Sequence, residues 1–254
     1  MAVREEQCFG TYCDGEFEIC TITTENIEEA LDVLHRSFFV KESVVIGSEI
    51  NLPENEQARQ ELRLLSKIVG QDGVSLMARH RPTKKIVSVA FNKIQYVDDT
   101  VQEVFFEVFK NKYCSSPNSI SLLNYMISMD EKINVFDIYN IDCVLEIMFL
   151  ATLPEFEKRG LGKILCEYSI ELVKNINKGI GIDKLHPNLK DKIPKGLCSL
   201  LTSKFSQKIG DKLGFKTLNR VPFSEYKFNG KSFADRIGPQ HPDSTQSFLH
   251  INDC

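Results

Sequence analysis

The chain has 254 residues, of which 42% are hydrophobic and 26% are charged, and it carries a formal net charge of -4. These values are typical of a globular protein and exclude a wholly disordered chain. The small negative charge provides no general attraction for nucleic acid, so we expect no nucleic-acid partner. No segment has the apolar length of a membrane span, and the first residues lack the apolar core of a signal peptide. We therefore expect a cytoplasmic protein with no membrane partner, and a monomer is the simplest state.

Eight cysteines are irregularly spaced along the chain, with no CxxC pair and no histidine pair at zinc-finger spacing. This pattern indicates neither a metal site nor a disulfide framework. We therefore predict reduced thiols and no metal.

The chain shows no internal repeats. We interpret residues 1–14 as an N-terminal tail and residues 15–254 as one domain, which is long enough to bury its own core. Residues 175–196 are rich in Lys, Asn, Gly and Pro without a period, so we predict a long surface loop there. A loop of this length indicates a functional or variable insertion.

The N-terminal third contains one predicted strand and two predicted helices. Alternating apolar residues over 17–22 predict the strand. Apolar residues fall on one helical stripe over 26–38, where Asn26 and Glu29 have the spacing of a capping box. The second helix is predicted over 53–70, because it also carries a single apolar face.

The middle of the chain supplies the centre of a sheet. Short apolar runs at 74–78 and 86–91 flank a turn sequence and predict an antiparallel hairpin. Periodic apolar residues predict a helix over 119–131. Residues 143–153 are almost continuously apolar, as is typical of a central strand covered on both faces.

The C-terminal part begins with an amphipathic helix over 160–174, directly after the central strand. A short strand at 197–201 and a helix at 203–212 come next. Two further strands are predicted at 215–220 and 246–251, separated by a polar loop. The mixture of strands and helices indicates an α/β domain.

The glycine loop, residues 158–163, lies between the predicted central strand and the helix that follows it. Such a turn leaves several backbone N–H groups unpaired at a helix N-terminus, which is a favourable place for a phosphate. Gly160 and Gly162 allow close approach of the backbone, and nearby basic side chains add positive charge. The pattern lacks the third glycine of a dinucleotide fingerprint and the Lys-Ser/Thr of a P-loop. On these residues alone, an ordinary glycine turn before a core helix is an equal alternative.

The segment from Phe149 to Gly162 resembles the acetyl-CoA motif of the GNAT superfamily. The resemblance implies a mixed, mostly antiparallel central sheet that is splayed at the acetyl-CoA strand and flanked by helices. It also implies acetyl-CoA as a co-substrate that binds through backbone groups at the end of the strand and through its pyrophosphate at the loop. The matching residues are Leu150, Ala151 and Thr152 for the pantetheine arm, and Lys158, Arg159, Gly160, Leu161, Gly162 and Lys163 for the pyrophosphate.

Glu157 departs from the motif, because the superfamily usually has Gln or Arg three residues before the first glycine. We therefore expect backbone amides, assisted by Lys158, Arg159 or Lys163, to hold the pyrophosphate without the usual side chain.

Within the superfamily, the chain is similar to the insect arylalkylamine N-acetyltransferases. Three segments carry this similarity, at residues 36–43, 134–142 and 203–227. The similarity extends over most of residues 17–251, and the glycine loop and the Lys-Leu-Gly-Phe sequence at 212–215 are its most specific parts.

The resemblance implies three catalytic residues. The reaction needs a neutral amine, so a base must accept its proton. Glu42 matches the glutamate that acts as this base, and the alternative is a solvated glutamate in a charged loop. The family implicates two hydroxyls near the leaving thiolate, which correspond to Ser206 and, ranked after it, Thr202. The alternatives are a helix cap for Thr202 or Ser203 and an exposed serine for Ser206.

The implied activity is direct transfer of an acetyl group from acetyl-CoA to a small primary amine, without a metal. The family favours an arylalkylamine such as dopamine, serotonin or tyramine. Polyamines or agmatine are alternative acceptors. A protein N-terminus or lysine is a further alternative, and so is a CoA-binding protein with little catalysis.

Overall fold

The computed structural model describes residues 5–97 and 105–251. Its centre is an eight-stranded sheet in the order β1-β2-β3-β4-β5-β6-β10-β7, and every neighbouring pair is antiparallel except β5 and β6. The strands are β1 (Cys8–Tyr12), β2 (Phe17–Thr21), β3 (Leu76–His80), β4 (Lys85–Tyr96), β5 (Cys143–Thr152), β6 (Gly196–Leu201), β7 (Lys216–Pro222) and β10 (Asp243–His250). The predicted mixed, mostly antiparallel α/β architecture is therefore confirmed.

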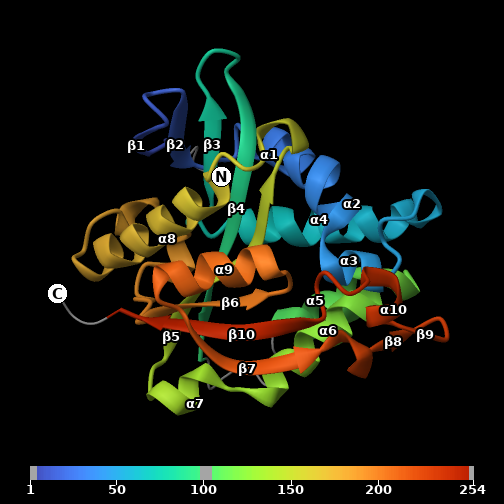
Figure 1. Cartoon of the computed structure of the whole chain (residues 1–254). Coiled ribbons are helices and arrows are strands. Elements are labelled where there is room, and N and C mark those ends of the chain that lie inside the picture. The colour runs from blue at the N-terminus through green and yellow to red at the C-terminus, as the bar shows by residue number, and fades with distance from the viewer. Residues whose placement is uncertain (1–4, 98–104, 252–254) are drawn as a thin grey trace.

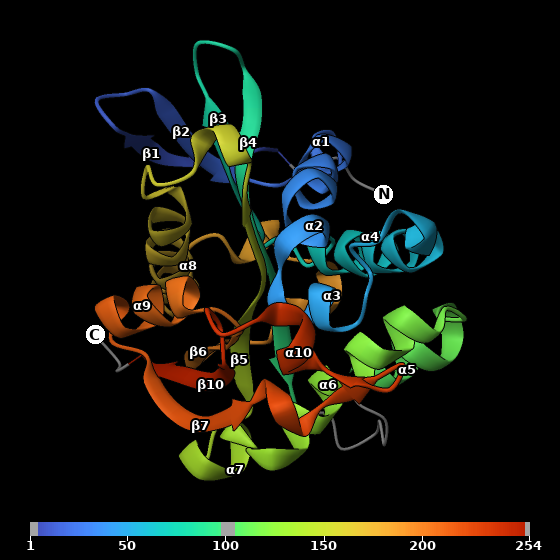
Figure 2. The same cartoon turned by 45° about the vertical axis from the view of Figure 1, so that its right-hand side comes forward.

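Helices cover both faces of this sheet. They are α1 (Ile27–Val33), α2 (Phe39–Lys41), α3 (Ser43–Gly47), α4 (Glu56–Gly70), α5 (Phe105–Tyr113), α6 (Pro117–Lys132), α7 (Val135–Tyr139), α8 (Leu161–Asn177), α9 (Lys204–Leu213) and α10 (Phe233–Ile237). Figure 2 shows α8 on one side of β3, β4 and β5, with α1 and α4 on the other. None of the helices within residues 5–97 and 105–251 is long and apolar enough to cross a membrane.

The central strand is buried on both faces, as its apolar sequence predicts. Residues Cys143 to Ile147 of β5 are buried, and Phe149 is 2% exposed. Most of the predicted elements form within a few residues of their expected bounds, including the hairpin β3–β4 and the helices α4, α6, α8 and α9.

Strand β5 separates from β6 partway along its length. The parallel pairing of β5 with β6 consists of Leu145 with Leu197 and Glu146 with Cys198. On its other side, β5 pairs with β4 from Cys143 to Thr152. Strand β6 pairs on its other side with β10 along its whole length, from Gly196 to Leu201. Figure 1 shows the result, in which β3 and β4 run upright while β6, β10 and β7 cross beneath them. The sheet is therefore splayed at β5.

The predicted tail is partly wrong. Residues 8–12 form β1, which pairs with β2 through Thr11 with Glu18 and Tyr12 with Phe17. The prediction failed because a five-residue edge strand with one partner has little periodicity of its own. Residues 1–4 of the tail, and 252–254 of the predicted domain, lie outside the described residues.

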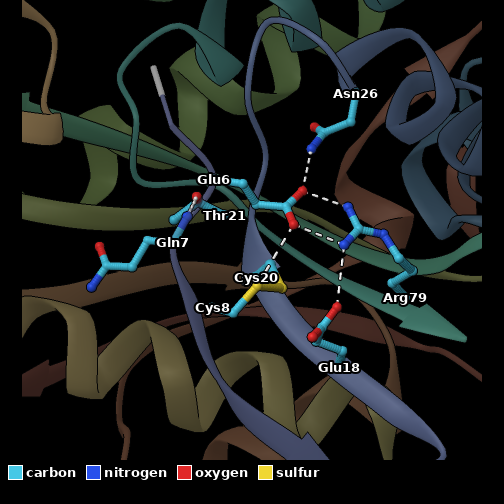
Figure 3. Close-up of a disulfide and its surroundings, with 8 residues drawn as sticks. All are labelled: Glu6, Gln7, Cys8, Glu18, Cys20, Thr21, Asn26 and Arg79. Atoms are coloured by element: carbon cyan, nitrogen blue, oxygen red, sulfur yellow. Dashed lines mark hydrogen bonds and ion pairs between the residues drawn. A yellow bond between two sulfur atoms is a disulfide. The ribbon is translucent and has the colours of Figure 1, made fainter. Parts of the chain in front are cut away.

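The prediction of reduced thiols is wrong for two cysteines, because Cys8 and Cys20 form a disulfide (Figure 3). They are cross-strand partners in β1 and β2. Such a pair depends on strand register, which irregular cysteine spacing cannot show. Among the described residues, the free cysteines are Cys13, Cys114, Cys143, Cys166 and Cys198.

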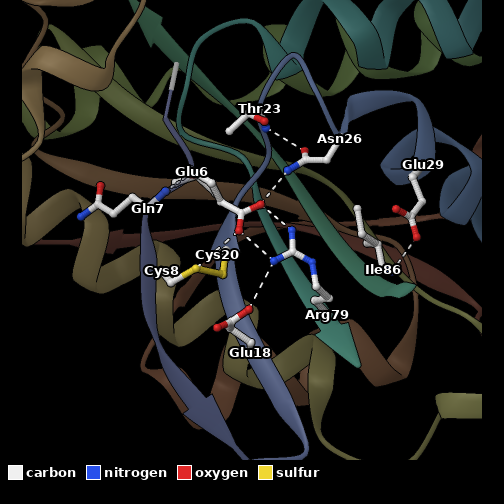
Figure 4. Close-up of polar contacts among 11 residues, drawn as sticks. Glu6, Gln7, Cys8, Glu18, Cys20, Thr23, Asn26, Glu29, Arg79 and Ile86 are labelled. Carbon is white, nitrogen blue, oxygen red and sulfur yellow. Dashed lines mark hydrogen bonds and ion pairs between the residues drawn. A yellow bond between two sulfur atoms is a disulfide. The ribbon is translucent and has the colours of Figure 1, made fainter. Parts of the chain in front are cut away.

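The predicted capping box of Asn26 and Glu29 is absent. Asn26 precedes α1 without a side-chain cap, and it accepts a hydrogen bond from the Thr23 N–H at 2.8 Å instead. The Glu29 carboxylate accepts from the Ile86 N–H at 2.9 Å (Figure 4). Both side chains therefore join the helix to other segments and leave its first turn to the backbone.

Two predicted loops contain more structure than expected. The segment 175–196 includes the end of α8, two short 3-10 turns and the buried residues Leu185 and Leu189. The segment between β7 and β10 includes the two-stranded β8 (Lys227–Phe228) and β9 (Lys231–Ser232), followed by α10. Helices α5 and α7 were also not predicted. All these pieces are short, so periodicity does not reveal them.

Candidate functional site

A cavity of about 820 Å³ lies where β5 and β6 part. This volume is in the range of roughly 300–1,000 Å³ that is usual for small-molecule and cofactor sites. Eight of the nine predicted cofactor residues line it, together with all three predicted catalytic residues. They are Leu150, Ala151, Thr152, Lys158, Gly160, Leu161, Gly162 and Lys163, with Glu42, Thr202 and Ser206. The splayed sheet thus brings two distant sets of residues to one space.

The glycine loop has the geometry of an anion site. Lys158 has φ of +61° and Gly160 has φ of +81°, and Gly160 stands at the N-cap of the 17-residue helix α8. The N–H groups of Leu161, Gly162 and Lys163 lie in the first turn, where an α-helix has no carbonyl for them to bind. These donors and the helix dipole favour an anion at this end of the cavity.

Five lysines line the same cavity: Lys41, Lys158, Lys163, Lys208 and Lys212. Lys41 and Lys163 are each ion-paired with a glutamate, and the others add positive charge. Lys208 and Lys212 were not predicted as site residues. Their spacing of four in α9 places them on one face of that helix. This spacing is visible in the sequence, but only the fold shows that this face of α9 lines the same cavity as the glycine loop.

Arg159 is the predicted cofactor residue that does not line the cavity. Its Nη1 donates to the Glu16 carboxylate at 2.7 Å, and its guanidinium lies 4.8 Å from the centre of the Phe17 ring. Glu16 and Phe17 belong to the N-terminal hairpin, which consists of β1, β2 and the turn between them (residues 8–21). Arg159 therefore connects the glycine loop to that hairpin.

Glu157 forms an ion pair with Lys41, and both residues line the cavity. The acid that departs from the motif is therefore neutralised by a base from another element. Sequence spacing could not reveal this partner, because the two residues are far apart in the chain and Lys41 lies at the end of α2.

Glu42 is placed by the break between α2 and α3. It has extended backbone angles at the N-cap of α3, and its carboxylate accepts from the Val45 N–H at 2.8 Å. The Thr202 hydroxyl donates to the same carboxylate at 2.6 Å. Glu42 is half-buried and lines the cavity. Desolvation raises the pKa of Glu42, although the hydrogen bonds from Thr202 and the backbone partly oppose it.

The two candidate hydroxyls have different partners. Ser203, and not Thr202, caps α9, and it forms a capping box with Ser206. The Ser206 hydroxyl donates to the Ser203 carbonyl at 3.0 Å. Thr202 is therefore hydrogen-bonded directly to Glu42. Ser206 takes part in the cap of α9 and also lines the cavity.

The cavity wall near Glu42 is apolar and aromatic. It includes Val44, Leu122, Tyr125 and Met126. The Tyr125 hydroxyl donates to the Ser244 hydroxyl at 2.5 Å, and burial strongly raises the pKa of this tyrosine. Tyr125 therefore stays neutral, and its hydroxyl proton is engaged in the hydrogen bond to Ser244. Phe205, which is 74% exposed, lies on another part of the wall.

Comparison with known proteins supports the fold. No protein-family model and no curated protein matches the chain. Arylalkylamine N-acetyltransferase 2 from Aedes aegypti superposes with a TM-score of 0.75 at 23% identity, over 93% of this chain and 99% of its own. The polyamine N-acetyltransferase of Drosophila melanogaster gives 0.65 at 15% identity, over 92% and 100%. The chain therefore has the predicted GNAT fold.

A third solved structure shows that this fold serves more than one reaction. The C-terminal condensation domain of Ebony, in complex with beta-alanyl-dopamine, gives a TM-score of 0.58 at 15% identity, over 92% of this chain and 99% of its own. The reaction must therefore be argued from the side chains in the cavity.

Replacing Gly160 with Ala tests the geometry of the glycine loop. A side chain at this φ costs roughly 1–2 kcal/mol, and the new Cβ would lie 2.5 Å from the Tyr12 hydroxyl. Gly179 has a φ of +80° with no neighbour within 4 Å, so Gly179→Ala is a control for backbone strain alone. We expect urea unfolding to show a larger loss of stability for Gly160→Ala. Equal losses would contradict the contact with Tyr12.

Glu42→Gln tests the raised pKa through stability. In the pH window between the ordinary and the raised pKa, the folded chain holds a proton that the unfolded chain has released. Wild type therefore loses stability as pH rises through that window, and the variant does not. We expect the Tm of the variant minus that of wild type to increase between pH 5 and pH 8.

Glu61→Gln is the matched control for this experiment. Burial acts to raise the pKa of Glu61, but hydrogen bonds from Ser119, Ser115 and Ser116 outweigh it and hold the pKa below its ordinary value. The Glu61 carboxyl therefore titrates below the tested window, and its Tm difference should stay constant. A constant difference for Glu42→Gln as well would show that the pKa of Glu42 is not raised.

Proposed function

We propose that the protein is an acetyl-CoA-dependent N-acetyltransferase that acts on a small primary amine. The observation that carries the proposal is that one cavity at the splayed strand combines an anion site at the glycine loop with a half-buried carboxylate, Glu42. The solved structures with this fold include amine N-acetyltransferases, which supports the same activity.

The residues of the cavity fit acetyl-CoA. The part of β5 beyond Glu146 has no parallel partner in β6, so its edge can pair with the amide groups of an extended pantetheine arm. The first turn of α8 and the lysines around it can bind the pyrophosphate. Gly162 packs near the Leu150 side chain, which keeps the helix close to the strand end.

The side chains around Glu42 support direct transfer. The amine nitrogen attacks the thioester carbonyl, Glu42 accepts the proton that the nitrogen loses, and the carbon–sulfur bond breaks to release the CoA thiolate. The proton then passes to the thiolate sulfur. Thr202 holds the carboxylate in place, so we rank it ahead of Ser206 as the hydroxyl on this proton path. The raised pKa of Glu42 suits a base that works near neutral pH.

The walls favour an arylalkylamine over a polyamine or agmatine. The carboxylates among the cavity-lining residues in the described part of the chain are Glu42 and Glu157, and the latter is paired with Lys41. A second cationic group on the acceptor would therefore meet no unpaired carboxylate there. Apolar and aromatic side chains such as Val44 and Leu122 instead suit an aromatic ring.

Release of CoA thiol from acetyl-CoA, measured with aryl amines, polyamines and peptides, tests this function. We expect aryl amines to be the best acceptors. Glu42→Gln should lower kcat/KM roughly 100-fold or more, as expected for loss of a general base. Glu171→Gln, at an exposed position of α8, is the matched control and should keep wild-type activity.

Three outcomes would contradict parts of this proposal. Normal turnover by Glu42→Gln would exclude Glu42 as the base. Peptides as the best acceptors would indicate a protein acetyltransferase. Binding of acetyl-CoA without thiol release on any amine would indicate a CoA-binding protein with little catalysis.

The lysines of α9 have their own test. Lys208→Ala and Lys212→Ala each remove one exposed positive charge from the cavity. We expect about a threefold increase in KM for acetyl-CoA at low salt. The increase should shrink at high salt because exposed charges are screened. Lys216→Ala, on β7 and outside the cavity, is the control. An unchanged KM in both α9 variants would place the phosphates elsewhere.

A further inference from the structure

The N-terminal hairpin, residues 8–21, forms one edge of the sheet, and its tip reaches the glycine loop. Its two strands, β1 and β2, lie beside α8 in both views (Figures 1 and 2). Phe9 packs against Tyr168 of α8, with ring centres 5.7 Å apart. A Cβ atom added to Gly10 would lie 3.0 Å from the Tyr168 hydroxyl. The hairpin is therefore packed against the helix that begins at the glycine loop.

The tip of the hairpin contacts the glycine loop on two sides. The Tyr12 hydroxyl lies close against the backbone of Gly160, since a Cβ there would be 2.5 Å away. Glu16, in the turn of the hairpin, binds Arg159 at 2.7 Å and also lies 3.2 Å from Nε2 of His80. The N-cap residue of α8, Gly160, and the residue before it, Arg159, are thus both held by the hairpin.

The other end of the hairpin is fixed by a disulfide and an ion-pair network. Cys8 in β1 is bonded to Cys20 in β2 (Figure 3). The Glu6 carboxylate accepts from Arg79 at 2.8 Å and from Asn26 at 2.9 Å (Figure 4). Strand β1 has one neighbour in the sheet, so this end determines how firmly β1 is attached.

We propose that the N-terminal hairpin positions the glycine loop for acetyl-CoA, and that the Cys8–Cys20 disulfide sets how firmly it does so. This inference rests on the proposed function. Tyr12 and Glu16 are positioning residues, because they act through Gly160 and Arg159 and not on the substrate. When the disulfide is oxidised, the glycine loop is held in the conformation that binds acetyl-CoA. When it is reduced, β1 moves more freely, and the glycine loop becomes ordered only on binding acetyl-CoA.

The opening step is a thiol–disulfide exchange with a small dithiol. The Cys8–Cys20 bond breaks, each sulfur gains a proton, and the dithiol is oxidised to its own disulfide. Two electrons pass from the dithiol to the protein. Reoxidation by oxidised glutathione reverses the step and yields reduced glutathione.

The carboxylates and sulfurs around the disulfide do not favour a metal ion while the two cysteines are bonded to each other. Donor atoms of Glu6, Cys8, Glu18 and Cys20 lie within 4.8 Å of one another. However, the two sulfurs are bonded to each other, and both carboxylates are paired with Arg79. The geometry therefore favours a covalent clamp.

Calorimetric titration of acetyl-CoA into the oxidised and the dithiothreitol-reduced protein tests the inference. We expect reduction to weaken binding about three- to tenfold, the cost of ordering one or two side chains on binding. Cys8→Ser should bind as weakly as reduced wild type and should not respond to dithiothreitol. Cys114→Ser removes a free cysteine outside the hairpin, and it should keep the full response.

Two further measurements separate positioning from general damage to the fold. KM for the amine should stay unchanged in Cys8→Ser while KM for acetyl-CoA rises, and reoxidation of reduced wild type should restore tight binding. Tyr12→Ala should weaken acetyl-CoA binding in the oxidised protein, and Tyr12→Phe should weaken it less.

Equal affinity of the oxidised and reduced proteins would overturn the hairpin inference and leave the proposed function intact. Complete alkylation of Cys8 and Cys20 in protein treated with oxidised glutathione would also overturn it, because no disulfide would then form. Absence of any acetyl-CoA binding by the oxidised protein would contradict the proposed function and the inference together.

Discussion

The parting of β5 from β6 is the constraint on which the rest of the molecule depends. The two strands pair at Leu145 and Glu146, and beyond that point β5 leaves β6, which stays paired with β10 along its whole length. The Ser199 hydroxyl donates to the Ile147 carbonyl at 2.8 Å where the strands separate. An open strand edge in the middle of a sheet is costly unless something binds it. Helices α2, α3, α6, α8, α9 and α10 all contribute residues to the walls of this gap.

The gap also explains why charges are arranged as they are. Thr202 and the start of α3 hold Glu42 in place, and desolvation there raises its pKa, which costs stability at neutral pH. The same shift makes it a suitable base, so stability and activity are expected to oppose each other at this residue. At the phosphate end, the ion pair of Lys41 with Glu157 removes an acid that would otherwise repel an anion.

Local sequence patterns predicted the long elements and the glycine loop, because periodicity and a glycine turn are local features. The buried run of β5 and the glycine loop are examples. Short elements such as α5 and α7 were missed because they have little periodicity, whereas the misses at the site depend on a distant partner. The role of Arg159 depends on Glu16, and the Cys8–Cys20 disulfide depends on the register of β1 and β2. The ranking of Ser206 over Thr202 came from family resemblance, whereas the contact between Thr202 and Glu42 exists only in the folded chain.

Amide hydrogen exchange with and without saturating acetyl-CoA tests the central claim most directly, because it reports where the ligand binds. The account predicts slower exchange in two segments. They are the end of β5 that has no partner in β6, at residues 148–152, and the glycine loop, at residues 158–163. The outer strand β7 should exchange as before. Protection confined to other segments, or no protection at saturating acetyl-CoA, would contradict the assignment of this gap as the acetyl-CoA site.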